Sequence, residues 1–168
     1  AFAYPVSSED DIKIKIEALK KKYFDATHHC FAWMLGADTI RFRAVDDGEP
    51  NHSAGDPILG QIRSKNLTNV LVVVVRYYGG TKLGVGGLIQ AYKISAEAAL
   101  NNAIIVERDV TQTVELSFSY NENAEVMRLI KEYDLKVLSQ NYAEDCKMKL
   151  EVRLATRDRF LAKLNLLA

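Results

Sequence analysis

The segment from Val70 to Val75 places the strongest limit on how this chain can fold, because every residue in it is apolar. Successive side chains of a β-strand point to opposite faces of the sheet. A strand that is apolar on both faces must therefore be covered on both faces. The segment predicts a central strand inside a domain that has packing layers on either side.

The sequence around this strand predicts a mixture of helices and strands. Ser8, followed by three acidic residues, is typical of a capped helix start. Asp56 and Pro57 suit the N-cap and first position of a second helix. Strands are expected at 28–35 and 39–45, and helices at about 8–23, 56–65 and 88–101.

The pattern changes after Val110, and from Thr111 onward the chain contains no Gly or Pro. We predict strands at 111–120, 135–142 and 147–154, and helices at 122–133 and 156–167. This β-α-β-β-α order is one strand short of a ferredoxin-like α/β sandwich. The expected fold class is α+β, with one domain at 1–110 and a ferredoxin-like C-terminal domain, its last strand missing, at 111–168.

A glycine-rich segment follows the central strand, with five Gly in the nine residues from Gly79 to Gly87. A strand, a glycine turn and a helix together present backbone N–H groups to an anion. The Walker A motif fails because Leu83 follows Lys82, and G-x-G-x-x-G fails because position 89 is Ile. The glycines predict either an anion-binding loop or a turn that needs positive φ and tight packing.

Arg76, Tyr77 and Tyr78 lie at the exit of the central strand. Alternation along a strand puts Arg76 and Tyr78 on one face and Tyr77 on the other. A guanidinium beside a ring can bind phosphate and stack on a base. The alternative is that the rings cover the sheet edge and Arg76 pairs with a nearby carboxylate. The candidate ligand- or RNA-binding residues are Arg76, Tyr77, Tyr78, Gly79, Gly80, Lys82, Gly84, Gly86 and Gly87.

A second polar segment precedes the helix expected at 56–65. Its oxygens and imidazole can bind a hard cation or position a water, but acidic side chains in turns also cap backbone amides. No second ligand cluster accompanies it, so neither a metal nor a cofactor is expected. His29 and Cys30 are adjacent in a strand and cannot form a dyad, so Cys30 is expected in the core. The candidate polar site consists of His29, Asp46, Asp47, Glu49, His52 and Asp56.

Charge and composition restrict the partners and the compartment. Lys plus Arg and Asp plus Glu both number 22, so no overall charge draws the chain to nucleic acid or to a membrane surface. A local basic patch would be needed for RNA binding, and six cations are available: Arg41, Arg43, Arg63, Lys65, Arg76 and Lys82. No apolar stretch is long enough to span a bilayer, and two distant Cys suggest reduced thiols, so a cytoplasmic protein without a membrane partner is expected.

Three ordered motifs resemble the signature of the IMPACT/YigZ family: HHCFAWML, DDGEPNHSAGDPILGQI and RYYGGTKLGVGGLIQAY. The β-α-β-β-α pattern that follows resembles the C-terminal domain of the bacterial members. The resemblance implies an N-terminal domain similar to the second domain of a small-subunit ribosomal protein and to the fourth domain of elongation factor G. The chain departs from the full pattern because it lacks an opening strand and a closing C-terminal strand.

The resemblance implies a role in translation. Eukaryotic relatives regulate translation by engaging the activator of a general-control kinase, but they carry an RWD domain that this chain lacks. The first hypothesis is a protein that contacts RNA or a ribosomal particle through the Arg-Tyr-Tyr-Gly-Gly surface. The second is an enzyme or small-molecule phosphate- or metal-binding protein with a pocket between the acidic and glycine segments. The third is a regulator that binds a protein of the translation machinery. Whether the chain is an enzyme stays open.

Overall fold

The computed structural model describes residues 1–142 and 146–166 and divides the chain into two compact units, Ala1–Ile105 and Val106–Ala168. Both units combine helices with one antiparallel sheet, which is an α+β fold as predicted. Each unit has a hydrophobic core of its own.

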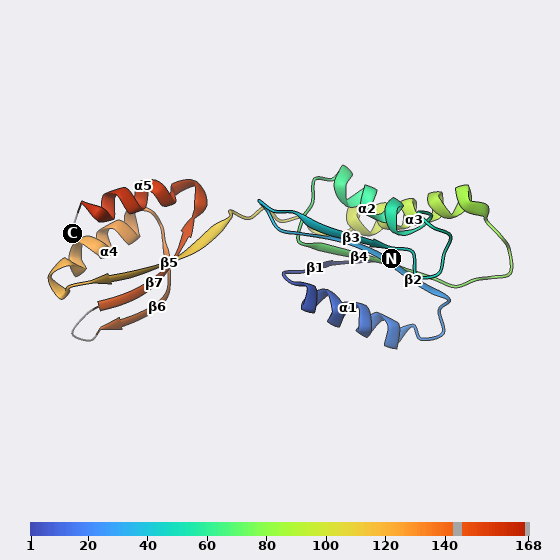
Figure 1. Ribbon diagram of the computed structural model, residues 1–168, viewed down its shortest axis with the longest axis horizontal. Helices are drawn as coiled ribbons and strands as arrows, with labels where there is room; N and C mark the ends of the chain where they lie inside the picture. The colour runs from blue at the N-terminus through green and yellow to red at the C-terminus, as the bar shows by residue number, and fades with distance from the viewer. Residues whose placement is uncertain (143–145, 167–168) are drawn as a thin grey trace. The chain divides into compact units, whose positions relative to one another are not determined.

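The first unit is a four-stranded antiparallel sheet with helices on both faces. The strands lie in the order β1-β4-β2-β3. They span Phe2–Pro5 (β1), His28–Leu35 (β2), Arg41–Val45 (β3) and Val70–Arg76 (β4). Helix α1 (Glu9–Lys22) covers one face, and helices α2 (Gly55–Ser64) and α3 (Gly84–Asn101) cover the other (Figure 1).

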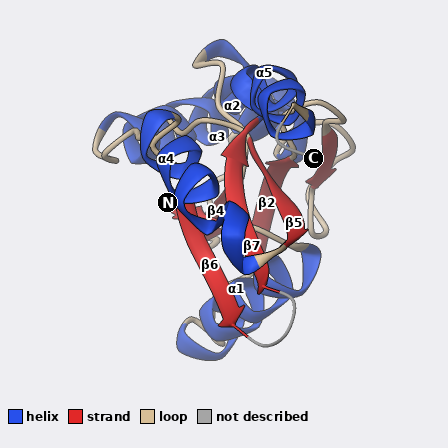
Figure 2. Cartoon of the chain, turned by 90° about the vertical axis from the view of Figure 1, so that its left-hand side faces the viewer, coloured by secondary structure: helices blue, strands red, loops and turns tan. Residues whose placement is uncertain are grey.

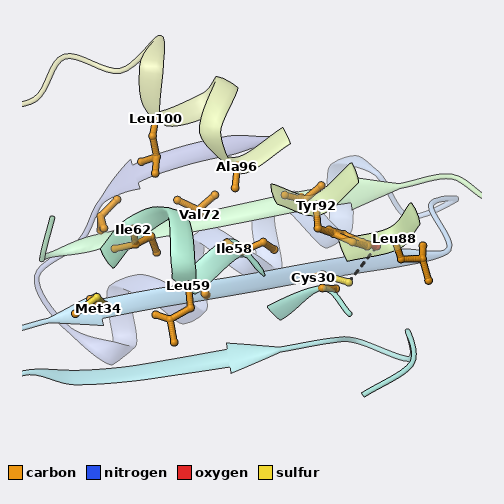
Figure 3. Close-up of a cluster of buried hydrophobic side chains, with 14 residues drawn as sticks. Cys30, Met34, Ile58, Leu59, Ile62, Val72, Leu88, Tyr92, Ala96 and Leu100 are labelled. Atoms are coloured by element: carbon orange, nitrogen blue, oxygen red, sulfur yellow. Dashed lines mark hydrogen bonds between the residues drawn. The ribbon is translucent and has the colours of Figure 1, made fainter. Parts of the chain in front are cut away.

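Strand β4 is the central strand that its composition predicts. Val70, Val72 and Val74 pack in the cluster that includes α2 and α3, as Figure 3 shows for Val72. Leu71 and Val73 point the other way and pack in the cluster that includes α1. The prediction of a strand covered on both faces is confirmed.

The starts of helices α1, α2 and α3 agree with the sequence-based predictions to different degrees. The Ser8 Oγ atom accepts a hydrogen bond from the backbone N–H of Asp11 at 3.1 Å, which confirms the predicted cap of α1. The prediction that Asp56 caps α2 is wrong, because α2 begins at Gly55 and its N-cap residue is Ala54. Helix α3 begins at Gly84 rather than Leu88, so the last three glycines form its first turn.

The second unit is a three-stranded sheet with both helices on one face (Figures 1 and 2). Strand β7 lies between β5 and β6, and all pairings are antiparallel. The elements are β5 (Thr111–Phe118), a 3-10 turn (Tyr120–Glu122), α4 (Asn123–Glu132), β6 (Lys136–Tyr142), β7 (Cys146–Arg153) and α5 (Leu154–Asn165). The predicted end of the last helix at 167 lies outside the described residues.

Candidate functional site

The glycine segment connects β4 to α3, and most of its glycines have no internal packing role. Gly80 and Gly84 adopt positive φ values of +87° and +71°, which accounts for glycine at these two positions. Gly79 and Gly86 do not. A Cβ atom added at any of these four positions would meet no other atom within 4 Å. Tight internal packing therefore does not explain them, and their backbone is open to an incoming partner.

Arg76 is the last residue of β4, just before this segment, and is paired inside the protein. Its Nη1 atom is 2.6 Å from Oε1 of Glu49, and the two side chains are only 18% and 4% exposed. Its guanidinium also lies 5.6 Å from the ring centroid of Tyr78, which is on the same face as expected. The structure therefore shows the carboxylate pairing that the sequence left as an alternative for Arg76.

Glu49 is the centre of a buried polar network. Its Oε1 atom also accepts a hydrogen bond from the Tyr92 hydroxyl at 2.7 Å, and its Oε2 atom lies 3.7 Å from Nε2 of His28. The Tyr92 hydroxyl lies 3.3 Å from Sγ of Cys30, the contact drawn in Figure 3. Burial, followed by the contacts with Cys30 and Glu49, raises the pKa of Tyr92. The network joins the acidic segment, which runs from Asp46 to Asp56, to β2, β4 and α3.

Sequence reasoning missed Tyr92, although a signal was present. Leu88, Tyr92, Ala96 and Leu100 recur every four residues and form the buried face of α3. A Tyr in such a row needs a hydrogen-bond partner for its hydroxyl. The position therefore predicts a polar group in the core, but not which one.

Asp46 is used to hold its own loop and the start of α2. Its carboxylate accepts hydrogen bonds from the backbone N–H groups of His52 at 2.9 Å, Ala54 at 3.0 Å and Gly55 at 2.8 Å. Burial alone would raise the pKa of Asp46, but these three hydrogen bonds outweigh it and lower the pKa. The capping interpretation therefore describes Asp46, whereas Glu49 is an ion-pair partner.

The other polar candidates fall into separate pairs. Oδ2 of Asp47 accepts a hydrogen bond from the backbone N–H of His29 at 2.7 Å, and Nε2 of His29 is 2.9 Å from the Tyr23 carbonyl oxygen. His52 and Asp56 contact each other at 2.6 Å on the surface. Within residues 1–142 and 146–166, no group of three or more His, Cys, Asp or Glu side chains is placed to hold a metal ion.

The two tyrosines at the exit of β4 are held in place while their rings stay about half exposed. Tyr77 is 53% exposed and donates its hydroxyl to Oδ1 of Asp25 at 2.9 Å. Tyr78 is 47% exposed and donates its hydroxyl to the Gly80 carbonyl oxygen at 3.1 Å. These contacts fix the ring positions, so the rings are available to a partner at little cost in side-chain entropy.

The six cations that were available for a basic patch lie at two ends of the sheet, so they do not form a single patch. Arg76 is opposite His28 at the start of β2, whereas Arg41 is opposite Leu35 at its end. Eight residues of strand separate these ends by roughly 23 Å. The Arg63 guanidinium lies over Phe42 at 4.5 Å, near the Arg41 end. Only Lys82 and Arg76 belong to the glycine end.

Cys30 should be unreactive in the folded protein. Its side chain is fully buried, and burial raises the pKa of the thiol to about 12. The thiolate is the nucleophile, so we expect no labelling by iodoacetamide at pH 8 until the chain unfolds. Because the folded-state pKa is the higher one, this group also costs stability as the pH rises from about 9 to 12. Rapid labelling of Cys30 without unfolding, measured by peptide mass spectrometry, would contradict the core assignment.

The sequence model of the Impact N-terminal domain matches residues 1–100, which include all of these motifs. The chain belongs to the IMPACT family. The IMPACT family member YvyE of Bacillus subtilis is 38% identical over 83% of this chain and 69% of its own length. The IMPACT family member YigZ of Escherichia coli is 32% identical over 90% of this chain and 76% of its own length.

A relative from animals and a solved structure extend the similarity. Human Protein IMPACT is 33% identical to this IMPACT family chain over 67% of the chain, but over only 34% of its own length. A structure titled "Crystal structure of an hypothetical protein" is 29% identical in sequence and has a TM-score of 0.69. The aligned region covers 96% of this chain and 80% of the chain in that structure. The resemblance that the three motifs suggest is confirmed.

Two surface hollows bear on the hypothesis of a small-molecule pocket, and the lengths and apolar character of the helices bear on whether one could cross a membrane. One hollow lies between β1 and α3, and the other beside Arg153 in the second unit. Neither is lined by the acidic segment or by the glycine segment. No helix among the described residues is both long and apolar enough to cross a membrane.

Proposed function

We propose that this IMPACT family chain is a translation-associated binding protein that contacts RNA or a ribosomal particle through one surface of its first unit. We call this the glycine surface, and it consists of Tyr77, Tyr78, Gly79, Gly80, Lys82, Gly84 and Gly86. The observation that carries the proposal is the open space at the four glycine Cβ positions beside two fixed, half-exposed rings. Backbone N–H groups and the exposed Lys82 suit phosphate oxygens, and tyrosine rings suit bases.

Fold similarity supports the same role. We propose that the first unit is similar to the second domain of a small-subunit ribosomal protein and to the fourth domain of elongation factor G. The order β5-β7-β6, with both helices on one face, supports a ferredoxin-like sandwich without its last strand in the second unit. Domains of these kinds occur in proteins that work on ribosomes, so we propose a cytoplasmic location as well, with the shared fold serving as an analogy for function.

Arg76 acts within this proposal as a positioning residue. Its guanidinium is paired with Glu49 and largely covered, so it is not free to bind a phosphate. It lies against Tyr78 and thereby supports one of the exposed rings. Phosphate contact therefore falls to Lys82 and to the backbone, and an Arg76 substitution alters both folding and binding.

A protein of the translation machinery is the second candidate partner. Leu83, Val85 and Ile89 are exposed beside the glycines, and Val85 and Ile89 are four residues apart on α3. Exposed apolar residues of this kind favour a protein contact. The two hollows described above lie away from the acidic and glycine segments, so neither supports the enzyme or small-molecule hypothesis.

Replacing Gly86 with Gln should weaken binding without harming the fold. Gly86 lies in α3 with no neighbour within 4 Å, so Gln there fills outside space and replaces a poor helix former. We expect the free energy of unfolding to rise by about 0.5 kcal/mol. Affinity for ribosomes, measured by co-sedimentation, should fall at least tenfold, or about 1.4 kcal/mol.

Gly60→Gln is the matched control for this experiment. Gly60 is an exposed glycine of α2 that also has no neighbour within 4 Å, but it lies outside the glycine surface. Its variant should gain similar stability and bind like the wild type. Equal binding by all three proteins would remove the glycine surface from the proposal. A wild type that binds neither ribosomes nor RNA would overturn the proposed function.

A further inference from the structure

Helix α1 ends in three consecutive lysines, and a fully exposed aromatic ring follows them. Lys20, Lys21 and Lys22 form the last turn of α1 and are all exposed. Phe24 comes two residues later and is 83% exposed. The lysines suit the negative end of the helix dipole, whereas Phe24 belongs to neither core cluster of the first unit.

The turn that carries Phe24 is bonded directly to the exit of β4. The backbone N–H of Thr27 donates to the Arg76 carbonyl oxygen at 3.0 Å, and Oγ1 of Thr27 accepts from the N–H of Tyr78 at 3.2 Å. The Tyr77 hydroxyl binds Asp25, the residue after Phe24. Phe24 therefore lies in the turn beside Tyr77, and the lysines directly precede this turn in the chain, so these residues make up a surface that shares Tyr77 with the glycine surface.

The charges of this surface are only partly neutralised. Nζ of Lys20 lies 3.6 Å from Asp47, and its side chain remains about half exposed. Nζ of Lys22 lies 5.3 Å from the centroid of the Tyr23 ring, where a ring face attracts a cation without cancelling its charge. Asp25 keeps its negative charge while it accepts the hydrogen bond from the Tyr77 hydroxyl. The three lysines against Asp25 and Asp47 leave a formal local charge of +1 (3 − 2), although the charge of the whole chain is zero.

We propose that Lys20, Lys21, Lys22, Phe24 and Tyr77 form a binding site for single-stranded RNA. This inference rests on the proposed contact with RNA and names the form of RNA that the site takes. Phe24 and Tyr77 stack on unpaired bases, and the lysines neutralise neighbouring phosphates. A duplex keeps its bases stacked on one another, so it offers these rings no free base face. A protein partner would have to desolvate three lysines, which disfavours it.

The test compares a fluorescein-labelled oligouridylate with an RNA hairpin of equal length by fluorescence anisotropy. The full-length wild type should bind the single strand at least tenfold more tightly than the hairpin. Phe24→Ala should lower affinity for the single strand about tenfold or more, because one stacked base is lost. Lys21→Gln should reduce the slope of log affinity against log salt. Ile14→Ala also removes an exposed apolar side chain, but one of α1 that lies outside the proposed site. It should change neither the affinity for the single strand nor the slope against salt.

Two kinds of failure are distinguishable. Wild type that binds ribosomes or the hairpin, with Phe24→Ala unchanged on the single strand, overturns this inference and leaves the glycine surface intact. Wild type that binds none of the three probes overturns the proposed function as well. Because Phe24 is exposed, circular dichroism of Phe24→Ala should match the wild type, so lost binding cannot be attributed to unfolding.

Discussion

Replacing Glu49 with Gln should lower the free energy of unfolding of the first unit by about 3 kcal/mol. The substitution keeps the size of the side chain but removes the charge that pairs with Arg76 at 2.6 Å. It leaves a guanidinium that is only 18% exposed without a counter-charge, and it weakens the acceptor of the Tyr92 hydroxyl. Urea unfolding followed by the fluorescence of Trp33, the single Trp of the chain, measures the effect in this unit.

Glu9→Gln provides the matched comparison within the same unit. Glu9 pairs with Arg41 at 2.7 Å, but the two side chains are 59% and 60% exposed. Water screens this pair, so its loss should cost no more than about 1 kcal/mol. If both variants lose the same small amount of unfolding free energy, the Glu49 network is not what holds the acidic segment to β4.

The parts of the fold that sequence reasoning predicted depend on local pattern. The unbroken apolar run of Val70 to Val75 is typical of a strand covered on both faces, and Ser8 lies three residues before the N–H that it caps. Such signals lie within one element, so they need no knowledge of the tertiary structure. For the same reason, the strands and helices of the second unit begin and end within a few residues of their predicted bounds.

The features that were missed depend on contacts between distant residues. Asp56 fits the local pattern of an N-cap, but the amides at the start of α2 are bonded by Asp46 from outside the helix. Glu49 and Arg76 are 27 residues apart, and nothing local indicates that they pair. The start of α3 was placed four residues late because glycine is a poor helix former, whereas the helix extends back to Gly84.

The structure distributes the polar contacts among the candidate site residues differently from the hypothesis based on the sequence. Sequence reasoning assigned phosphate binding to Arg76, which the structure places inside a buried pair. The basic patch considered from the sequence did not include Lys20 to Lys22, which form a basic last turn of the kind that is ordinary for a helix. Only the bonds from Thr27 and Asp25 to β4 bring that turn to the glycine surface.

The second unit has a core that shares no residue with those of the first, which supports our proposal that the domains divide near residue 110. Phe160 is the largest side chain of that core with no exposed area. Its ring packs edge-on against the ring of Tyr133, with the two ring centroids 5.7 Å apart. Removing such a ring costs about 3–5 kcal/mol. A domain of this size has little stability to lose, so Phe160→Ala should leave the second unit largely unfolded at room temperature.

If the two domains fold independently, Phe160→Ala should not change the urea transition of Trp33, which reports on the first unit. Hydrogen exchange should show the matching loss of protection in the strands and helices of the second unit and not in those of the first. Arg159→Ala, a change at the exposed neighbouring position of α5, should leave both readouts as in the wild type. A Trp33 transition that shifts together with the loss of protection would mean that the two cores unfold as one cooperative unit, because only a coupled structure transmits a cavity in α5 to a strand of the other sheet.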